Sequence, residues 1–201
     1  MTEAPIVSQT DIDDHEDVKR HAEGRPNEGV TMKLIDREGN EVPEGEEGEV
    51  VVKGPQVMRG YVDSSLDADA FTPDGFLHTG DLGRFDKHGA ILITGRIKDI
   101  IIRKGENVSA KEVEDVLYTH PAIADVAVLG IPDEDRGEMV VAFVVPAEGS
   151  DAPNLKAIFD FCRESGLMTQ KIPERLEIVE VMPRNPSGKV PKHELRATIG
   201  F

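Results

Sequence analysis

Residues 100–117 read IIIRKGENVSAKEVEDVL, and here the chain changes from short strands to a mixture of strand and helix. The apolar run at 100–102 is typical of a buried strand, and the polar residues 104–108 predict a loop. Residues 109–112, SAKE, have the composition of a capping box, in which a serine and a glutamate bind amides at a helix start. The helix that follows is expected to bury one face, formed by Val113, Val116 and Leu117.

The remaining C-terminal sequence continues this mixed pattern. Strands are predicted at Ile123–Leu129 and Glu138–Val145, on either side of the turn at 132–137. A helix is predicted over Leu155–Glu164, with Leu155, Ile158, Phe159 and Cys162 on its buried face. This half of the chain is therefore expected to be a compact α+β domain.

The first half favours small antiparallel β structure. Strands are predicted at Thr31–Ile35, Glu49–Lys53 and Ala90–Thr94, with a short helix over Ser64–Phe71. The acid-rich segment 11–28 is predicted to be a solvated loop, because it lacks the glycine and glutamate that a calcium-binding EF-hand loop requires.

These patterns divide the chain into two domains. Residues 1–95 are predicted to be a terminal β subdomain, 96–99 a hinge, and 100–201 a mobile lid domain. The overall fold class is thus α+β, a small antiparallel β subdomain followed by a compact α+β domain.

Composition excludes several classes of protein. The 201 residues carry a net charge of −16, so a nucleic acid or an anionic membrane would be repelled by the surface overall. The longest apolar stretches, such as Met139–Val145, are strand-sized and too short to span a bilayer. Cys162 is the only cysteine, which favours a reducing cytoplasm, and the six histidines show no paired metal-ligand spacing.

One lysine near the C-terminus lies on a loop that contains two prolines and a glycine. The segment Pro183–Val190 reads PRNPSGKV, and it lies between an apolar strand and a short terminal helix. The prolines stiffen the approach and Gly188 lets the backbone turn, so Lys189 can be presented to an anion. The segment lacks the spacing of a phosphate-binding P-loop, and a lone Ser-Gly-Lys is more often a solvated turn.

Five motifs in a fixed order favour a functional role for Lys189 over a solvated turn. They are Gly48-Glu49-Val50 with Gly60-Tyr61, Asp74-Gly75-Phe76 with Thr79-Gly80-Asp81, Gly95-Arg96 with Lys98-Asp99, Gly105 with Glu112-Val113-Glu114, and Pro186-Ser187-Gly188-Lys189. Together they resemble the acyl-adenylate-forming (AMP-binding) superfamily, which includes acyl-CoA synthetases, peptide-synthetase adenylation domains and luciferases. The resemblance covers practically the whole chain.

The resemblance implies roles for residues of the first half. Asp81 is expected to accept hydrogen bonds from the ribose hydroxyls of ATP or AMP, and Arg96 to reach the same nucleotide. Thr2 and Glu3 resemble the end of a motif whose threonine contacts phosphate and whose glutamate binds Mg²⁺. Without the resemblance, Asp81 would be taken as a turn residue and Arg96 as part of a surface ion pair.

The resemblance also assigns roles to the second half. Lys189 is expected to be catalytic, bridging the substrate carboxylate and the α-phosphate. Lys98 occupies the family's hinge position, and Gly105 leaves room for the thiol arm of coenzyme A in the second half-reaction. Two interpretations stay open for Lys104, which either pairs with a phosphate of coenzyme A or points into solvent.

The function implied is that of a ligase, an acid–thiol ligase of the acyl-CoA synthetase type. A carboxylic acid, ATP and coenzyme A are the expected substrates, with Mg²⁺ as cofactor, and residues 170–177 most resemble ligases of fatty and alicyclic acids. The family's phosphate loop and acyl pocket are absent from these residues, so the chain is expected to be a C-terminal portion that is inactive without a missing N-terminal domain.

Two alternatives remain open at this stage. One is a non-catalytic fragment that binds a nucleotide or a partner chain. The other is the adenylation domain of a peptide synthetase, which is disfavoured because no carrier domain follows Phe201.

Overall fold

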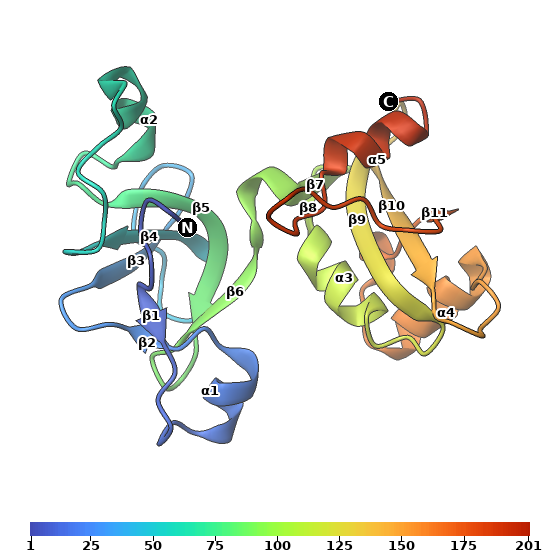
Figure 1. Cartoon of the computed structure of the whole chain (residues 1–201), viewed down its shortest axis with the longest axis horizontal. Coiled ribbons are helices and arrows are strands. Elements are labelled where there is room, and N and C mark those ends of the chain that lie inside the picture. The colour runs from blue at the N-terminus through green and yellow to red at the C-terminus, as the bar shows by residue number, and fades with distance from the viewer. The chain divides into compact units, whose positions relative to one another are not determined.

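The computed structural model describes all residues, 1–201, as two compact units, Met1–Lys98 and Asp99–Phe201. Both units combine β-sheet with short helices, which confirms the α+β fold class (Figure 1). None of the helices combines the length and apolar character needed to cross a membrane.

The first unit is built on a four-stranded antiparallel sheet. Its strands are β3 (Thr31–Ile35), β4 (Gly48–Lys53), β5 (Leu77–Phe85) and β6 (Ile91–Arg96), paired in that order. Alternate residues point to one side and form the core, which includes Leu34, Val50, Val52, Leu77 and Ile91. The antiparallel strands predicted for this half are confirmed, and β3 has the predicted bounds.

The N-terminal segment is more ordered than its sequence suggests. Residues 11–28, predicted to be a solvated loop, contain helix α1 (Glu16–His21) and strand β2 (Arg25–Pro26), which pairs with β1 (Ser8–Gln9). Val18 is fully buried, and the buried carboxylate of Asp14 is paired with Arg25. The loop prediction was therefore wrong, because a buried apolar side chain, an ion pair and backbone hydrogen bonds of Glu23 and Gly24 with Ile91 hold this acidic segment in place.

The helix predicted over Ser64–Phe71 is present in a shorter form. It begins as a 3-10 turn, η1 (Ser64–Leu66), and continues as α2 (Asp67–Ala70). Asp63 caps its start, since the carboxylate accepts a hydrogen bond of 3.0 Å from the Ser65 amide.

The second unit contains a five-stranded sheet centred on β10 (Gly137–Pro146). Strand β9 (Ile123–Asp133) pairs antiparallel with β10 along its length, and β11 (Arg175–Ile178) pairs parallel with it on the other side. A short hairpin of β7 (Ile100–Arg103) and β8 (Glu106–Ser109) joins β10 at Gly137. The two predicted strands of this region are confirmed, and β9 is longer than predicted.

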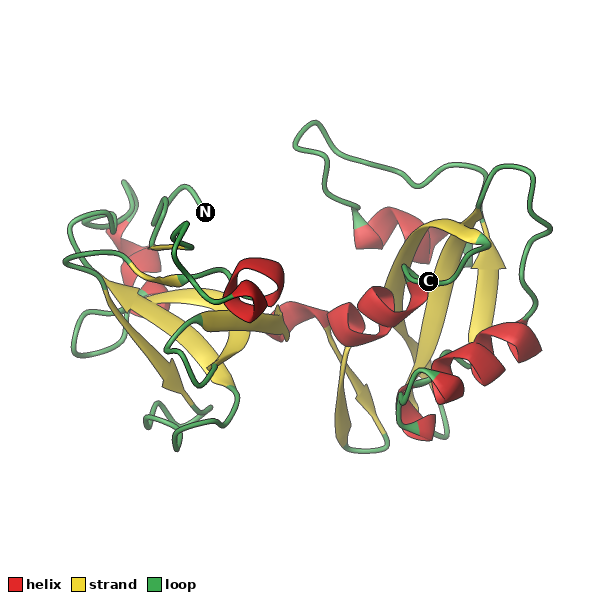
Figure 2. Ribbon diagram, turned by 90° about the horizontal axis from the view of Figure 1, so that it is seen from below, coloured by secondary structure: helices red, strands yellow, loops and turns green.

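Helices cover both faces of this sheet (Figure 2). On one face, α3 (Ala110–Leu117) and α4 (Leu155–Glu164) pack on inward-facing strand residues such as Val128 and Ala142. On the other face, Leu195 of α5 (Lys192–Thr198) packs on residues such as Leu129 and Phe143. Alternate side chains of β9 and β10 therefore feed two separate cores.

Two expectations about burial were wrong. Leu155, predicted to be on the buried face of α4, is 39% exposed, because it lies at the first position of the helix. Of the apolar run at 100–102, only Ile101 is buried, and Ile102 is 51% exposed. The reason is that β7 and β8 form an edge hairpin, so only alternate residues face the core.

The serine half of the capping box predicted at the start of α3 is confirmed. The Ser109 hydroxyl accepts a hydrogen bond of 3.3 Å from the Glu112 amide, as an N-cap residue does. Glu112 also binds the ammonium of Lys171, with its two carboxylate oxygens at 2.7 and 2.8 Å. Val113 and Leu117 are fully buried, and Val116 is partly buried against the same core.

Candidate functional site

Asp81 lies inside strand β5, where the strand is interrupted by a bulge. Opposite it, β4 pairs Glu49 with Leu82 and Val51 with His78, so the register shifts across the Thr79-Gly80-Asp81 segment. Gly80 adopts a positive φ of 71°, which favours glycine. The residue patterns alone suggested a turn at Asp81, whereas the structure places Asp81 in the bulged middle of one strand.

Side chains hold this bulge in place. The Thr79 hydroxyl donates to the carbonyl of Val50 at 2.7 Å and accepts from the Asp81 amide at 3.1 Å. The Gly80 amide donates to the Glu49 carboxylate at 3.1 Å. Bulges redirect side chains and are common next to active sites, so this arrangement fixes the direction of Asp81.

Asp81 and Arg96 are brought together by the pairing of β5 with β6. They are opposite each other in register, and the Arg96 Nε lies 2.8 Å from the Asp81 Oδ1. The side chains are 26% and 42% exposed, so solvent or a ligand can reach both. A carboxylate acceptor beside a guanidinium donor can bind hydroxyl groups and an anionic group at adjacent positions.

Thr2 and Glu3 are found at the edge of the same unit. The Glu3 carbonyl accepts from the Met58 amide at 2.8 Å, and its carboxylate accepts from the Tyr61 hydroxyl at 3.2 Å. Thr2 is exposed, whereas Ala4, two residues further on, is buried. Glu3 supplies a single carboxylate, which fits Mg²⁺ where phosphate oxygens and water complete the coordination.

The loop that carries Lys189 is organised by Asn185. The Asn185 side-chain oxygen accepts hydrogen bonds from the amide and hydroxyl of Ser187, at 3.0 and 2.7 Å, and from the Lys189 amide at 2.9 Å. The Asn185 amide donates to the Lys189 carbonyl at 2.9 Å, which closes the turn. Gly188 has a positive φ of 80°, so the predicted turn at this glycine is confirmed.

Arg184 anchors this loop to the start of β9. It donates to the Gly188 carbonyl at 2.8 Å and to the Asp125 carboxylate at 2.5 Å. Burial opposes ionisation of Asp125, but hydrogen bonds from Tyr118 and Arg184 outweigh burial and hold the pKa of this carboxyl below its usual range. Lys189 itself is exposed, on a base that its neighbours fix.

Lys104 and Gly105 form the turn between β7 and β8. Arg103 pairs with Glu106, and the two residues between them have φ values of 50° and 81°. Positive φ at both central positions is the geometry of a type I′ hairpin turn. The predicted loop at 104–108 was therefore wrong beyond this turn, because β8 begins at Glu106 and continues to Ser109.

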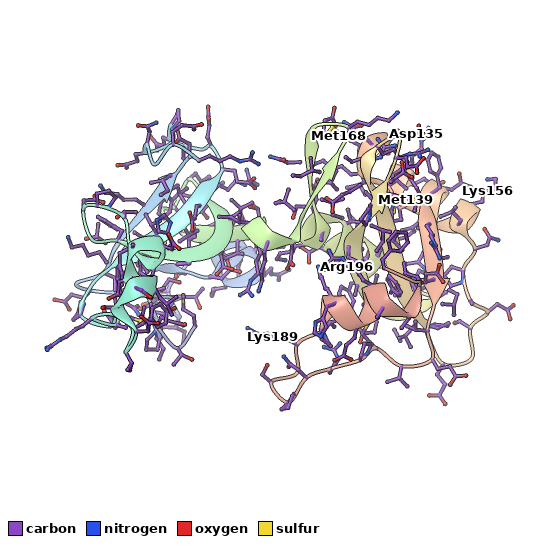
Figure 3. All side chains as sticks on the ribbon, turned by 90° about the horizontal axis from the view of Figure 1, so that it is seen from above. Asp135, Met139, Lys156, Met168, Lys189 and Arg196 are labelled. Atoms are coloured by element: carbon purple, nitrogen blue, oxygen red, sulfur yellow. The ribbon has the colours of Figure 1, made fainter.

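The Gly105 turn and the Lys189 loop are attached to opposite ends of β9. The Lys104 amide donates to the Arg136 carbonyl at 2.7 Å, just beyond the last residue of β9, whereas Arg184 holds the Lys189 loop at Asp125. From Asp125 to Asp133 an extended strand spans about 26 Å at ~3.3 Å per residue. Figure 3 shows Asp135 and Lys189 on opposite sides of the unit.

Lys98 is the last residue of the first unit, in a short 3-10 turn, η2 (Ile97–Asp99). Next to it, Asp99 lies 3.8 Å from the Lys192 ammonium, which is also 3.3 Å from the Glu114 carboxylate. Burial raises the pKa of Glu114 above its usual value despite the neighbouring Lys192. The start of the second unit is thus tied to α3 and α5 by charge.

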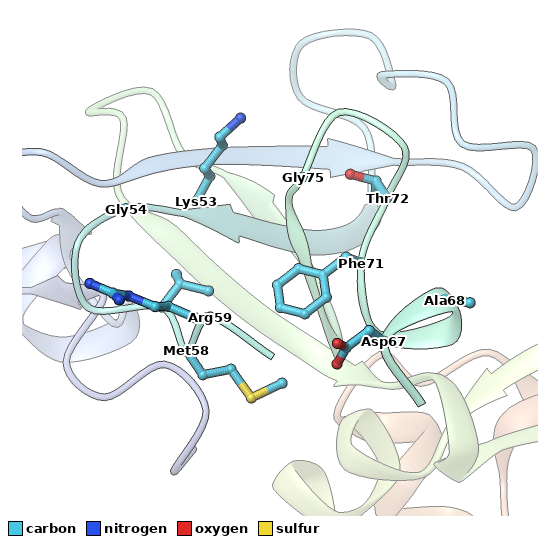
Figure 4. A pocket seen from close by; sticks show the side chains of 10 residues that line it. Lys53, Gly54, Met58, Arg59, Asp67, Ala68, Phe71, Thr72 and Gly75 are labelled. Atoms are coloured by element: carbon cyan, nitrogen blue, oxygen red, sulfur yellow. The ribbon is translucent and has the colours of Figure 1, made fainter. Parts of the chain in front are cut away.

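An open pocket of about 590 Å³ lies in the first unit, beside α2. Phe71, Met58 and Val57 provide apolar walls, and Asp67 and Arg59 provide charged groups (Figure 4). None of the predicted site residues lines it.

Sequence reasoning missed three features of these surfaces. The role of Asn185 could have been found, because Asn-Pro-Ser-Gly is typical of a turn in which asparagine binds the backbone ahead. No local sequence pattern indicates the contact of Tyr61 with Glu3. His15 and His88 also come together, although the histidines show no paired spacing in the sequence.

Comparison with known proteins gives consistent matches. The model of the AMP-binding enzyme family matches residues 1–62, and that of the AMP-binding enzyme C-terminal domain matches residues 112–189. Triostin synthetase I of Streptomyces triostinicus is 45% identical over 96% of this chain and 36% of its own length. The medium-chain fatty-acid–CoA ligase of Escherichia coli is 39% identical over 98% of this chain and 35% of its own length.

Among solved structures, an ATP-bound RpMatB-BxBclM chimera superimposes with a TM-score of 0.88 at 35% identity. The match covers 98% of this chain and 39% of the chimera. The chain therefore spans little more than a third of the length of the relatives it matches.

Proposed function

Because the chain belongs to the AMP-binding enzyme family and contains its C-terminal domain, we propose that it is the C-terminal part of an ATP-dependent carboxylic acid–CoA ligase. The longer protein would join a fatty or alicyclic acid to AMP and then transfer the acyl group to the thiol of coenzyme A. Its similarity to a medium-chain fatty-acid–CoA ligase supports this substrate class, and a cytoplasmic location is part of the same proposal.

In this proposal the first unit holds the nucleotide. Asp81 accepts hydrogen bonds from the ribose hydroxyls, and Arg96, 2.8 Å from it, donates to the nucleotide beside it. Thr2 contacts a phosphate, and Glu3 supplies one carboxylate to Mg²⁺, which when bound neutralises charge on the phosphates. The exposure of Asp81 and Arg96 and the bulge that directs Asp81 support these roles.

The second unit acts as the mobile lid. In the first step the substrate carboxylate attacks the α-phosphate and pyrophosphate leaves. Lys189 lies between these two anions and stabilises the charge that develops in the transition state. In the second step the coenzyme A thiol attacks the acyl carbonyl and AMP leaves, with the thiol arm passing the Gly105 turn and Lys104 near a phosphate of coenzyme A.

The observation that carries the proposal is the attachment of Lys189 and Gly105 to opposite ends of β9. One orientation of the unit cannot present both ends to the same point. Lys98, at the division between the units, is therefore assigned as the hinge whose backbone rotation exchanges the two ends.

The test uses the full-length protein and separates the two half-reactions in single-turnover assays. Lys189→Ala should lower acyl-adenylate formation by roughly 100-fold or more, while transfer from premade acyl-adenylate to coenzyme A continues. Gly105→Asn should impair only the transfer, because asparagine tolerates the positive φ but adds bulk at the turn. Equal losses in both steps for both variants would contradict the alternating lid.

A matched control addresses backbone strain at Gly105. Gly39 has a φ of 85° and open space around it, as Gly105 has, but it lies in a turn of the first unit. Gly39→Asn should therefore leave both half-reactions unchanged.

The alternative, a fragment that only binds a nucleotide or partner, is tested with the 201-residue chain alone. We expect it to fold without catalysing ATP–pyrophosphate exchange. Robust exchange by this chain would contradict the assignment of catalysis to the longer protein.

A further inference from the structure

Three potential metal ligands meet at one corner of the first unit. One ring nitrogen of His15, one of His88 and one carboxylate oxygen of Asp17 all lie within 4.8 Å of one another. The His15 Nδ1 is 3.3 Å from the Asp17 Oδ2. The two imidazole rings stack with their centroids 5.0 Å apart and their planes at 19°.

The backbone positions of these ligands are fixed by separate elements. His15 is the N-cap residue of α1, and its Nδ1 accepts a 3.2 Å hydrogen bond from the Asp17 amide. His88 lies in the turn between β5 and β6, where its amide donates to Asp86 at 2.8 Å and its carbonyl accepts from Arg25 at 3.0 Å. The fold therefore brings the three side chains together, and the stacked imidazole rings rotate on binding so that one nitrogen of each points at the ion.

One nitrogen of the cluster has no partner in the protein. The Nε2 of His88 is buried from solvent and makes no hydrogen bond. A buried polar atom without a partner is uncommon in native proteins, and an ion or ordered water often accounts for it. This is an independent indication that the cluster accommodates a further atom.

We propose that His15, Asp17 and His88 bind a divalent cation of the zinc class. Two imidazoles and a carboxylate are donors that Zn²⁺ accepts, whereas Mg²⁺ and Ca²⁺ prefer all-oxygen sites. Metal–ligand distances of about 2.0–2.1 Å in a tetrahedron place neighbouring ligand atoms about 3.3 Å apart. In this structure the ligand atoms lie within 4.8 Å of one another, so small side-chain rotations would bring them to this spacing.

The fourth position of such a site is left for water or an external group. The bound ion would join α1 to the β5–β6 turn, which Arg25 already links by contacting both Asp14 and His88. A cation also offsets part of the net charge of −16 that the chain carries. The consequence is a local clamp on the N-terminal segment, separate from the nucleotide and thiol chemistry proposed above.

The experiment titrates Zn²⁺ into tag-free chain by calorimetry and records the Tm with and without the metal. One equivalent should bind, and the Tm should rise, because a ligand that binds only the folded state stabilises it. Affinity should fall as the solution is acidified, since imidazole binds metal only in its neutral form. Mg²⁺ at the same concentrations should produce neither effect.

Variants locate the site. His88→Ala should weaken Zn²⁺ binding at least tenfold, and so should His15→Asn, which removes a ring ligand but retains an N-cap acceptor. His21→Ala is the matched control, because His21 lies on the same helix but outside the cluster. Absence of saturable binding, or equal losses in the His88 and His21 variants, would overturn the proposal.

Substitution of Co²⁺ gives a second, spectroscopic readout. The visible spectrum should show nitrogen and oxygen ligands without a sulfur charge-transfer band, because Cys162 is buried in the other unit. A sulfur band would assign the metal to the cysteine and overturn the site described here.

Discussion

Replacement of Lys192 by methionine should destabilise the second unit by about 2 to 3 kcal/mol at neutral pH. The Lys192 ammonium donates to the Val128 carbonyl at 2.8 Å and lies 3.3 Å from Glu114. Both side chains are only about a fifth exposed, at 20% and 21%, so solvent does little to screen the pair. Methionine keeps the aliphatic stem and a similar helix propensity but removes the charge.

The loss should depend on pH through Glu114. Burial raises the pKa of this carboxyl, and Lys192 opposes that rise, so the variant should raise the pKa further. A carboxyl whose folded pKa lies above its unfolded value contributes stability that is present below the unfolded pKa and is lost as pH rises through the folded pKa. The difference between wild type and variant should therefore be larger at pH 7.5 than at pH 4.5.

The measurement is urea unfolding followed by far-UV circular dichroism, because the chain contains no tryptophan. The two units are fitted as separate transitions, and only that of the second unit should shift. Lys111→Met is the matched control, since Lys111 forms an exposed pair with Asp115 on α3 at 2.7 Å. Such surface pairs contribute roughly 0 to 1 kcal/mol.

A double variant tests the assignment to Glu114. Glu114→Gln keeps an acceptor for the Val128 amide, now bound at 2.8 Å, but removes the charge. In that background Lys192→Met should lose its pH dependence. A cost for Lys192→Met that is the same at both pH values, or equal to that of Lys111→Met, would refute the reasoning.

Three further outcomes are expected. Glu174→Gln should destabilise the second unit by about 2 kcal/mol at pH 7, because Glu174 binds Arg103 at 2.6 Å and Arg136 at 2.9 Å. Although burial opposes ionisation, these arginines lower the pKa of Glu174, so its ion pairs stabilise the folded unit above the unfolded pKa. The difference in stability between wild type and variant, measured by urea unfolding, should therefore vanish as pH falls through the folded pKa. Burial raises the pKa of Cys162 to about 11, so a thiol reagent at pH 8 should label this thiol only after unfolding. Rapid labelling of the native chain would contradict the burial of Cys162. Ser109→Ala should cost about 1 kcal/mol in urea unfolding through loss of the α3 cap, whereas Ser109→Asp should restore most of that stability.

The regular elements were predictable where apolar periodicity is strong. Helix α4 has the predicted bounds, Leu155–Glu164, because apolar residues recur at helical spacing after the Asn154 cap. Helix α1 was missed because only Val18 of that segment is buried, which gives no periodic signal. Strand β8 was missed because its polar residues form an edge hairpin, whose pairing depends on the partner strand.

The candidate site was predictable only as separate motifs. The opposition of Asp81 and Arg96 depends on the register of β5 against β6, which single-sequence patterns do not determine. The attachment of the Lys189 loop to Asp125 joins residues far apart in the sequence through Arg184. The contact of His15 with His88 could not be predicted from the sequence either, since the two unrelated turns that carry them meet only after the sheet has formed.

In the lid role proposed above, the closed turn around Asn185 sets how accurately the second unit has to be placed for Lys189 to reach its anionic partners. The turn holds its own shape through internal hydrogen bonds, so its geometry does not have to be created when a partner surface arrives. The lysine beyond it is a compact charge on a flexible four-carbon stem. Under that proposal, coarse placement is left to the movement of the whole unit, and the final alignment is left to rotations within a single side chain.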